Sequence, residues 1–162
     1  MAKIRQFGKV VVGKEYTLRR GGYCVIRDAA DALAIVATPR GAFLLGGGQD
    51  GIETPQEALL REAHEECGCT LKVGERIGVA DQMLFAKEEK TYFRKRCTFF
   101  IAEIVAHEPA LTTEPDHRLV WLSVEEAIRC LVHESHGWAV QSVFKKKPNQ
   151  SPEPTRFARG SA

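Results

Sequence analysis

The amino-acid sequence predicts an α/β fold in which helices cover both faces of a mixed β-sheet. Three observations lead to this fold class. Residues 55–67 combine the apolar spacing of a helix with helix signals at both ends. Runs rich in β-branched and aromatic residues come both before and after that segment. A second helical segment follows the last of these runs, which favours a sheet with helices on its two faces.

The expected strands are separated by turn residues and by one charged hairpin tip at 87–90. A short lead-in strand is expected at 10–12, and a longer strand between 16 and 28. The second helix is expected from Val124 to about His133, with Ser123 as its N-cap. Residues 42–45 lead into the glycines, and the remaining expected strands are 33–37, 71–79, 82–85, 92–105 and 119–122.

The central helix is expected to begin at Pro55 and to end at Cys67. Thr54 and Glu57 have the spacing of a capping box, in which each side chain accepts a hydrogen bond from the other residue's backbone N–H. Proline is well tolerated at the first helical position, because its missing N–H is not needed there. Gly68 can adopt the positive φ that commonly ends a helix.

Three carboxylates share one face of this helix. Glu62, Glu65 and Glu66 are separated by three and four residues, which brings their side chains together. Such a cluster of repelling charges is readily accepted only if a cation binds to it. Carboxylate oxygens are hard ligands that suit Mg²⁺ or Mn²⁺. The segment therefore indicates a metal site and, with it, chemistry on phosphates.

The same segment resembles the signature motif of the Nudix hydrolases. That motif is a glycine, five residues, a glutamate, seven residues and then R-E-U-x-E-E-x-G-U, where U is a bulky aliphatic residue. At average residue frequencies, seven fixed matches would occur by chance about once in 10⁸ windows. A merely solvated acidic face would not require the matching glycines, glutamate and arginine. The fixed positions are occupied here by Gly47, Glu53, Arg61, Glu62, Glu65, Glu66 and Gly68.

The resemblance implies a Nudix-type α/β/α sandwich with a mixed β-sheet. It also implies Mg²⁺-dependent hydrolysis, with Mn²⁺ as a substitute, of a pyrophosphate bond in a nucleoside diphosphate derivative. By this resemblance Glu65 and Glu66 would bind the metal, and Glu62 would bind it or orient the attacking water. A backbone carbonyl of Gly46 or Gly47 would complete the metal's ligands.

Further roles also follow from the resemblance. Glu53 would stabilise the site or bind a second metal through water, and Arg61 would hold the carboxylates in place by charge-assisted hydrogen bonds. Family members often recruit another acidic residue, as ligand or base, from the loop before the last strand. Glu114 or Asp116 fits that position.

Two arginines of the expected strand 92–105 are candidate substrate-binding residues. Arg94 and Arg96 project from one side of the strand and could bind phosphate and base, although a solvated sheet edge is an equally good interpretation. His133 and His136 have a spacing that could bind a metal, but an exposed helix end is the simpler interpretation.

The chain departs from the usual family pattern around the glycines. Many members have proline where this chain has Leu45, and glutamate and glycine where it has Asp50 and Ile52. These positions shape the loop and leave the proposed metal ligands intact. The segment 114–117, with Trp121, is similar to small bacterial MutT-like proteins, which implies a bacterial source.

Composition restricts the function classes. The chain has 162 residues and a formal net charge of +2, which gives no strong field for nucleic acid or membrane. No apolar run is long enough to cross a bilayer, and the N-terminus lacks the apolar stretch of a signal peptide. Five scattered cysteines argue against a disulfide framework. We therefore expect a cytoplasmic protein that binds a small-molecule nucleotide, with neither membrane nor nucleic acid polymer as partner.

Residues 1–147 are expected to form a single domain, and 148–162, rich in proline and serine, a disordered C-terminal tail. Homodimers are common in the family, so a homodimer is a possible assembly.

The main alternative to a hydrolase is a Nudix-fold sensor that binds a nucleotide or sugar nucleotide without cleaving it. Loss of motif glutamates would favour that alternative, and none is lost here. Nucleoside triphosphates, ADP-ribose, dinucleoside polyphosphates and nucleotide sugars all remain candidate substrates.

Overall fold

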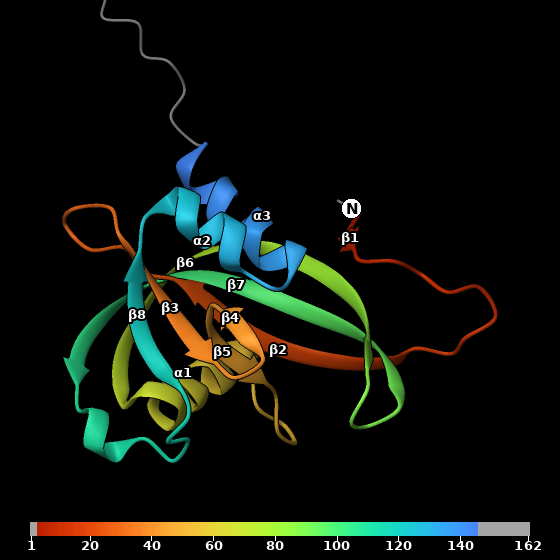
Figure 1. Ribbon diagram of the computed structural model, residues 1–162, viewed down its shortest axis with the longest axis horizontal. Helices are drawn as coiled ribbons and strands as arrows, with labels where there is room; N and C mark the ends of the chain where they lie inside the picture. The colour runs from red at the N-terminus through yellow and green to blue at the C-terminus, as the bar shows by residue number, and fades with distance from the viewer. Residues whose placement is uncertain (1–2, 146–162) are drawn as a thin grey trace, which may run out of the picture.

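Two β-sheets and three α-helices make up residues 3–145, the part of the chain that the computed structural model describes (Figure 1). The larger sheet is mixed, and its strands in spatial order are β1 (Arg5–Phe7), β6 (Cys69–Ala86), β7 (Thr91–His107), β2 (Thr17–Val25) and β5 (Leu45–Gly48). The smaller sheet is antiparallel, with the order β4 (Gly41–Phe43), β3 (Leu33–Thr38) and β8 (Arg118–Leu122). The tail expected at 148–162 lies outside the described residues.

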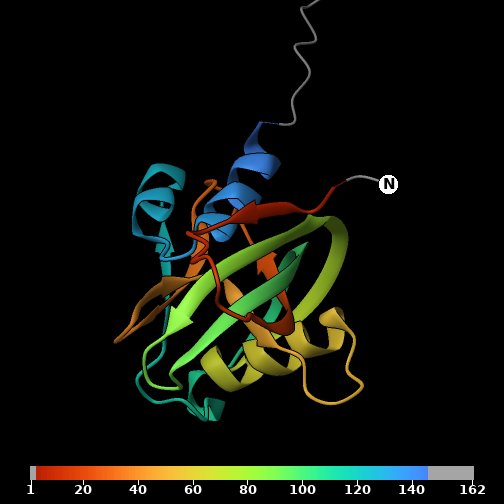
Figure 2. The same ribbon diagram turned by 90° about the vertical axis from the view of Figure 1, so that its right-hand side faces the viewer.

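The helices lie on opposite sides of the sheets, as Figure 1 and the rotated view in Figure 2 both show. Helix α1 (Pro55–Cys67) packs against β2, β5 and β6, whereas α2 (Val124–Cys130) packs against β3 and β8. Helix α3 (Glu134–Phe144) packs mainly against β6, and a short 3₁₀ helix, η1 (Pro109–Leu111), precedes β8. The predicted α/β architecture with a mixed sheet between helices is confirmed. None of the described helices is long and apolar enough to cross a membrane.

Side-chain alternation along the central strands divides the interior into two cores. Cys24 and Phe100 belong to the core that α1 covers, whereas their neighbours Val25 and Phe99 belong to the core that α2 and α3 cover. Successive side chains of a strand point to opposite faces of a sheet, so a strand buried on both faces is apolar along its whole length. These continuous apolar runs therefore require helices on both sides.

Helix α1 has the bounds that its end signals predict. The Thr54 hydroxyl accepts a hydrogen bond from the Glu57 N–H at 3.1 Å, and the Glu57 side chain completes the capping box. Gly68 ends the helix with φ = 65°. The first turn lies tightly against β2, because a Cβ atom at Gly22 would be 1.8 Å from the carbonyl oxygen of Pro55. Local signals thus fix the length of the helix, and a glycine contact fixes its position.

Two expected strand assignments were wrong. The lead-in strand forms at Arg5–Phe7 and pairs with β6, whereas residues 10–12 are exposed and form no strand. The ranges 71–79 and 82–85 belong to one continuous strand, β6. Register shifts between Val73 and Arg76, and again before Gly78, let this strand bend without ending.

The end of the chain also differs from the expectation. Helix α2 stops at Cys130 because the next residues pair with β4, where the Val132 N–H donates to the Ala42 carbonyl at 3.1 Å. The second helix of this region, α3, was not expected. His136 is fully buried, not exposed, and its Nδ1 accepts a hydrogen bond from the Leu44 N–H at 3.2 Å. This histidine therefore joins α3 to the chain between β4 and β5.

Removal of the α1 cap should lower stability. Thr54→Ala leaves an N–H of the first turn without its acceptor, and we expect a loss of about 1 kcal/mol in the free energy of unfolding. Chemical denaturation measures this change. Thr54→Ser keeps the hydroxyl and should remain close to the wild type, so equal losses in both variants would contradict a role for the capping bond.

Candidate active site

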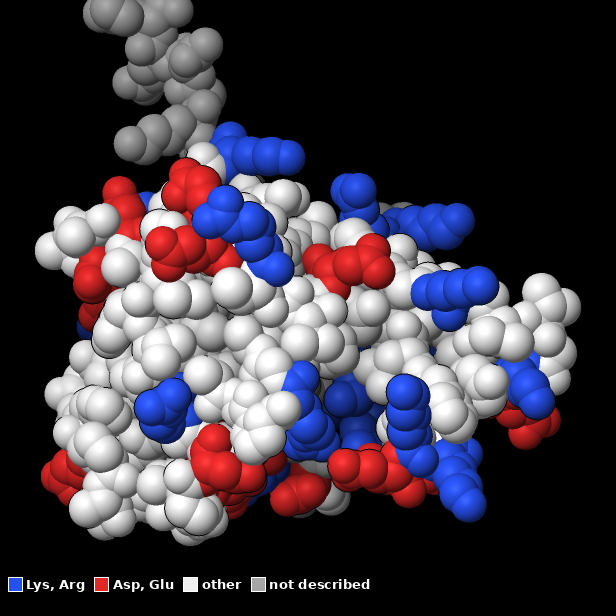
Figure 3. Space-filling model, viewed as in Figure 1, with Lys and Arg blue, Asp and Glu red and all other residues white. Residues whose placement is uncertain are grey.

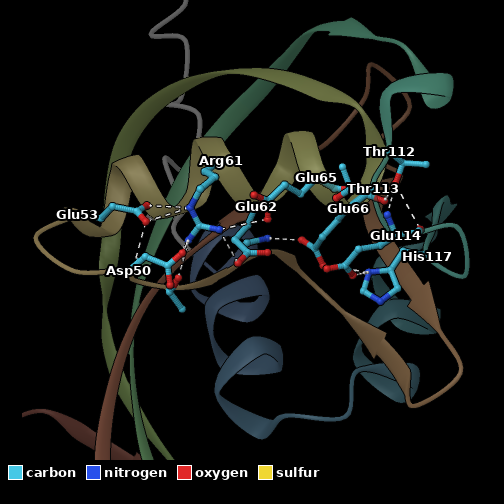
Figure 4. A network of polar contacts seen from close by, with 12 residues as sticks. Asp50, Glu53, Arg61, Glu62, Glu65, Glu66, Thr112, Thr113, Glu114 and His117 are labelled. Atoms are coloured by element: carbon cyan, nitrogen blue, oxygen red, sulfur yellow. Dashed lines mark hydrogen bonds and ion pairs between the residues drawn. The ribbon is translucent and has the colours of Figure 1, made fainter.

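Arg61 is the centre of a part-buried polar network between α1 and β5 (Figure 4). Its Nε donates to Glu53 Oε1 at 3.0 Å, and its Nη1 donates to Glu62 Oε1 at 3.0 Å and to Glu65 Oε2 at 3.2 Å. Its Nη2 donates to the carbonyl oxygen of Gly48 at 2.9 Å. Burial lowers the pKa of Arg61, but the hydrogen bonds to Glu53 and Glu62 outweigh it and raise that pKa overall. One permanently charged guanidinium therefore orients three carboxylates and ties α1 to β5.

Glu66 is the most deeply buried carboxylate of the group, with 7% of its surface exposed. Its Oε1 accepts a hydrogen bond from the Gly46 N–H at 3.1 Å. Burial is the main cause that raises the pKa of Glu66 to about 9; the Gly46 bond opposes this shift, and the neighbouring carboxylates contribute to it. Burial likewise raises the pKa of Glu62, although Arg61 opposes that shift. The site thus holds more negative charge than its own donors neutralise.

A loop between η1 and β8 adds two residues to this group. The Thr112 hydroxyl is 2.8 Å from the Glu65 carbonyl oxygen and 2.9 Å from the Glu66 carbonyl oxygen, which fixes the loop to the end of α1. His117 Nδ1 lies 2.8 Å from Glu114 Oε2 and 3.6 Å from Glu66 Oε2. Neither contact has the geometry of a hydrogen bond, and this buried nitrogen has no other partner among the described residues. The loop therefore places an imidazole between two carboxylates.

Strand β5 lets the carboxylates approach because it consists largely of glycine. A Cβ atom at Gly47 would lie 2.5 Å from the Glu62 Cδ atom, so any other residue would displace this carboxylate. Gly46 has φ = 135°, a backbone conformation that side chains disfavour. The glycines of the motif therefore place bare backbone directly against the acidic side chains.

These groups line a cleft of about 720 Å³. Glu62, Glu66, Glu114 and His117 contribute to its wall, and β5 contributes Gly46–Gly48. In the lower middle of Figure 3, basic side chains surround a hollow and acidic side chains lie just beneath them. The cleft thus offers carboxylates, cations and aromatic rings together. Its basic and aromatic lining includes Arg19, Arg20, Tyr23, Arg40, Phe43, Phe93, Lys95 and His133.

The structure brings most of the sequence-predicted site residues together, but in two roles. Glu62, Glu66 and Glu114 line the cleft, whereas Glu53, Arg61 and Glu65 lie behind it and are joined by the network around Arg61. Asp116, the alternative to Glu114, is exposed and does not line the cleft. His117 was missed by sequence reasoning, and the signal that could have found it is its position three residues after Glu114 in the same loop.

The two arginines predicted to bind substrate lie on the opposite face of β7. Arg96 forms two hydrogen bonds with the buried Asp81, at 2.9 and 3.0 Å, and Arg94 lies 3.8 Å from the same carboxylate. Their neighbours Phe93 and Lys95 line the cleft instead. Strand alternation was correctly expected, but it does not reveal which of the two sets of side chains faces the site.

The donor set fits a hard divalent cation. Within residues 3–145, no three acidic, histidine or cysteine side chains stand at metal-binding distances. Glu62 is bound instead to Arg61, and Glu66 to the Gly46 N–H. Even so, the carboxylates of Glu62, Glu66 and Glu114 all border one cleft, and oxygen ligands of this kind suit Mg²⁺. Burial raises the pKa of Glu66 most, and a cation there would relieve the charge repulsion that adds to this shift.

The chain belongs to the Nudix family, because the family model for the NUDIX domain matches residues 17–143. Members of this family are typically pyrophosphohydrolases, and the resemblance seen in the motif is thereby confirmed. A comparison of the sequence with curated proteins found no match.

Solved structures with the same fold support this assignment. A NUDIX hydrolase from Nitrosomonas europaea is 17% identical, with a TM-score of 0.63 over 81% of this chain and 90% of that chain. The MutT protein from Methanosarcina mazei Go1 is 19% identical, with a TM-score of 0.62 over 85% of this chain and 100% of that chain. An Ap4A hydrolase from C. elegans is 18% identical, with a TM-score of 0.59 over 79% of this chain and 95% of that chain. At these identities the likeness establishes the shared fold.

The charge on Glu66 should make the metal-free protein less stable as pH rises. The folded-state pKa of about 9 lies above the ordinary value of 4.5, so the folded state binds this proton more tightly than the unfolded state does. The resulting stability is complete below the ordinary value and is lost as pH rises through the folded-state pKa. We therefore expect the free energy of unfolding, measured by urea denaturation without metal, to fall between about pH 5 and 9.

Glu66→Gln removes the titrating group while keeping its shape, so this fall should become distinctly shallower in the variant. Glu125→Gln, which changes an exposed residue of α2, is the matched control and should retain the full slope. Parallel curves for Glu66→Gln and the wild type would contradict the assignment of the slope to Glu66.

Proposed function

We propose that the protein is a Mg²⁺-dependent hydrolase that cleaves a pyrophosphate bond in a nucleoside diphosphate derivative. The observation that carries this proposal is that two motif carboxylates, Glu62 and Glu66, line a cleft that also contains cations and aromatic rings. A protein that only binds nucleotides would have no need to keep Glu66 buried among other carboxylates, because that arrangement costs stability.

Glu62 and Glu66 are the proposed metal ligands, with a backbone carbonyl of Gly46 or Gly47 beside them. Glu65 would become a third ligand if it released its hydrogen bond with Arg61 and bound the metal instead. Bound Mg²⁺, or Mn²⁺ in its place, would neutralise phosphate oxygens and make a water molecule more acidic. The proposal is supported by the hard oxygen donors and by the unrelieved charge of the site.

The other motif residues would position the ligands. Arg61 holds Glu62 and Glu65 in defined orientations, and Glu53 holds Arg61 through two contacts at 3.0 and 3.2 Å. Glu114 is the proposed acceptor for the proton of the attacking water, because it borders the cleft. The imidazole of His117, 2.8 Å away, would help to position that carboxylate.

The substrate would lie with its phosphates along β5 and its base among the aromatic residues of the cleft. Backbone without side chains, as at Gly46–Gly48, permits the close approach of phosphate oxygens. The proposed substrate class includes nucleoside triphosphates, ADP-ribose, dinucleoside polyphosphates and nucleotide sugars. The C. elegans relative, named as an Ap4A hydrolase, falls within this class.

We also propose a reducing cytoplasmic location, since the five cysteines are all free thiols.

A hydrolysis screen tests the proposal directly. The purified protein is offered each substrate class with Mg²⁺, with Mn²⁺ and with chelator, and phosphate and pyrophosphate release are measured. Metal-dependent release from at least one compound is the expected result. Tight binding of one compound without turnover of any would favour the sensor and overturn the hydrolase proposal.

Glu66→Gln should lower metal-dependent turnover by at least about 100-fold while leaving the fold intact. The amide has the shape of the carboxylate but lacks its charge, so the metal loses a ligand. Steady-state rates with the best substrate of the screen measure the effect, and circular dichroism checks the fold. Glu125→Gln, on the exposed surface of α2, should keep full activity. Full Mg²⁺-dependent activity in Glu66→Gln would refute the ligand assignment.

A further inference from the structure

Lys95 is a cation in the cleft for which the proposed hydrolysis has no use. It is half-buried in the first part of β7 and lines the cleft. Among the described residues its ammonium group has no carboxylate within ion-pair distance, unlike Arg19, whose guanidinium is 3.6 Å from Glu89. Burial is the main cause that lowers the pKa of Lys95. Cys97 opposes this shift, and the nearby charges of Arg19 and Arg40 add smaller lowering effects on the same pKa. A buried charge without a partner is costly, and therefore needs an explanation.

Three cations from distant parts of the sequence converge at this point. Arg19 and Lys95 are direct neighbours on the paired strands β2 and β7, which places their backbones only about 4.8 Å apart. Arg40 comes from the turn between β3 and β4. The Arg19 guanidinium lies 4.5 Å from the centre of the Phe93 ring, and this stacking holds it over the floor of the cleft. Like charges on neighbouring strands repel, and Glu89 pairs with Arg19 but not with Lys95, so a bound anion would relieve the remaining repulsion.

The backbone of β5 lies between these cations and the carboxylates of α1. A Cβ atom at Gly47 would meet Glu62, whereas a Cβ atom at Gly48 would meet the Arg19 side chain at 3.8 Å. The side chain of Glu62 thus contacts one face of the glycine strand and that of Arg19 the other. The carboxylates of α1 therefore lie on one side of the cleft and are suited to bind a metal. Arg19, Arg40 and Lys95 lie on another side, the basic side, where a metal held by those carboxylates would not contact them.

We infer that Lys95, Arg19 and Arg40 bind a phosphate group additional to the two that the cleaved bond joins. The identity of the ligand as a substrate rests on the proposed function. The substrate class is then a nucleotide with a third phosphate, either in its phosphate chain or on a ribose. ADP-ribose and nucleotide sugars, which contain only the two phosphates of the cleaved bond, leave the basic side empty.

The first test measures anion binding without catalysis. Protein freed of divalent metal on a chelating resin is titrated with inorganic pyrophosphate in a calorimeter, because the unneutralised carboxylates then repel the probe from the metal side. Lys95→Gln should weaken binding by about tenfold or more, as expected for loss of a charge-assisted hydrogen bond. Lys95→Arg keeps the charge and should retain most of the affinity. Lys72→Gln, which removes an exposed lysine of β6 outside the cleft, should bind like the wild type.

Wild-type affinity in Lys95→Gln would overturn the inference, and so would absence of pyrophosphate binding by the wild type. Thermal denaturation of each variant identifies any that fails to fold, and Lys95→Arg then serves as the second substitution at the same position. Because no turnover is measured, the result is independent of whether the protein is a hydrolase.

The second test asks which phosphate is recognised. Values of kcat/KM are compared for diadenosine tetraphosphate against diadenosine diphosphate, and for NADP against NAD. Preference for the tetraphosphate places the additional phosphate in the chain, and preference for NADP places it on the ribose; either preference should shrink about tenfold in Lys95→Gln. Equal values within both pairs would contradict the inference. Absence of all turnover would refute the proposed function, while the pyrophosphate titration still decides the phosphate site.

Discussion

The rest of the structure depends on one constraint, the crowding of carboxylates between α1 and the glycine strand β5. Like charges at this spacing repel, so the fold must hold them with fixed donors. Arg61 and the Gly46 N–H are those donors, and both act only if α1 stays in register with β5. The capping box at Thr54 and the close contact at Gly22 are therefore parts of the site as well as parts of the helix.

Strand β5, whose glycines have no side chains, lies between the carboxylates of α1 and the cations Arg19, Arg40 and Lys95. The carboxylates next to the glycines come from α1 and from the loop before β8, whereas Arg19, Arg40 and Lys95 come from β2, the turn after β3 and β7. The hairpin tip between β6 and β7 adds charges of both signs to the rim. A polyphosphate ligand could contact both sides, through a divalent cation on one and directly on the other. Arg61 does not serve this ligand, because its guanidinium is already committed to Glu53, Glu62 and Glu65.

Local signals predicted the parts of the site that depend on a single element. The bounds of α1 and the shared face of its glutamates follow from residues within one helix, and both could be inferred without tertiary contacts. His117 could not, because Thr112 fixes its loop through carbonyl groups 46 and 47 residues earlier in the chain. Lys95 was missed for a related reason: alternation separates it from Arg94, but only the packing of β7 decides which side chain faces the cleft.

We expect a divalent cation to relieve the crowding of negative charge around Glu66. Calorimetric titration of the protein with Mg²⁺ at pH 8, repeated in buffers of different ionisation enthalpy, measures whether it does. Because the pKa of Glu66 is about 9 without metal, saturable binding should release close to one proton per Mg²⁺. In Glu66→Gln that release should disappear. Mg²⁺ binding without proton release, or no binding at all, would contradict the account.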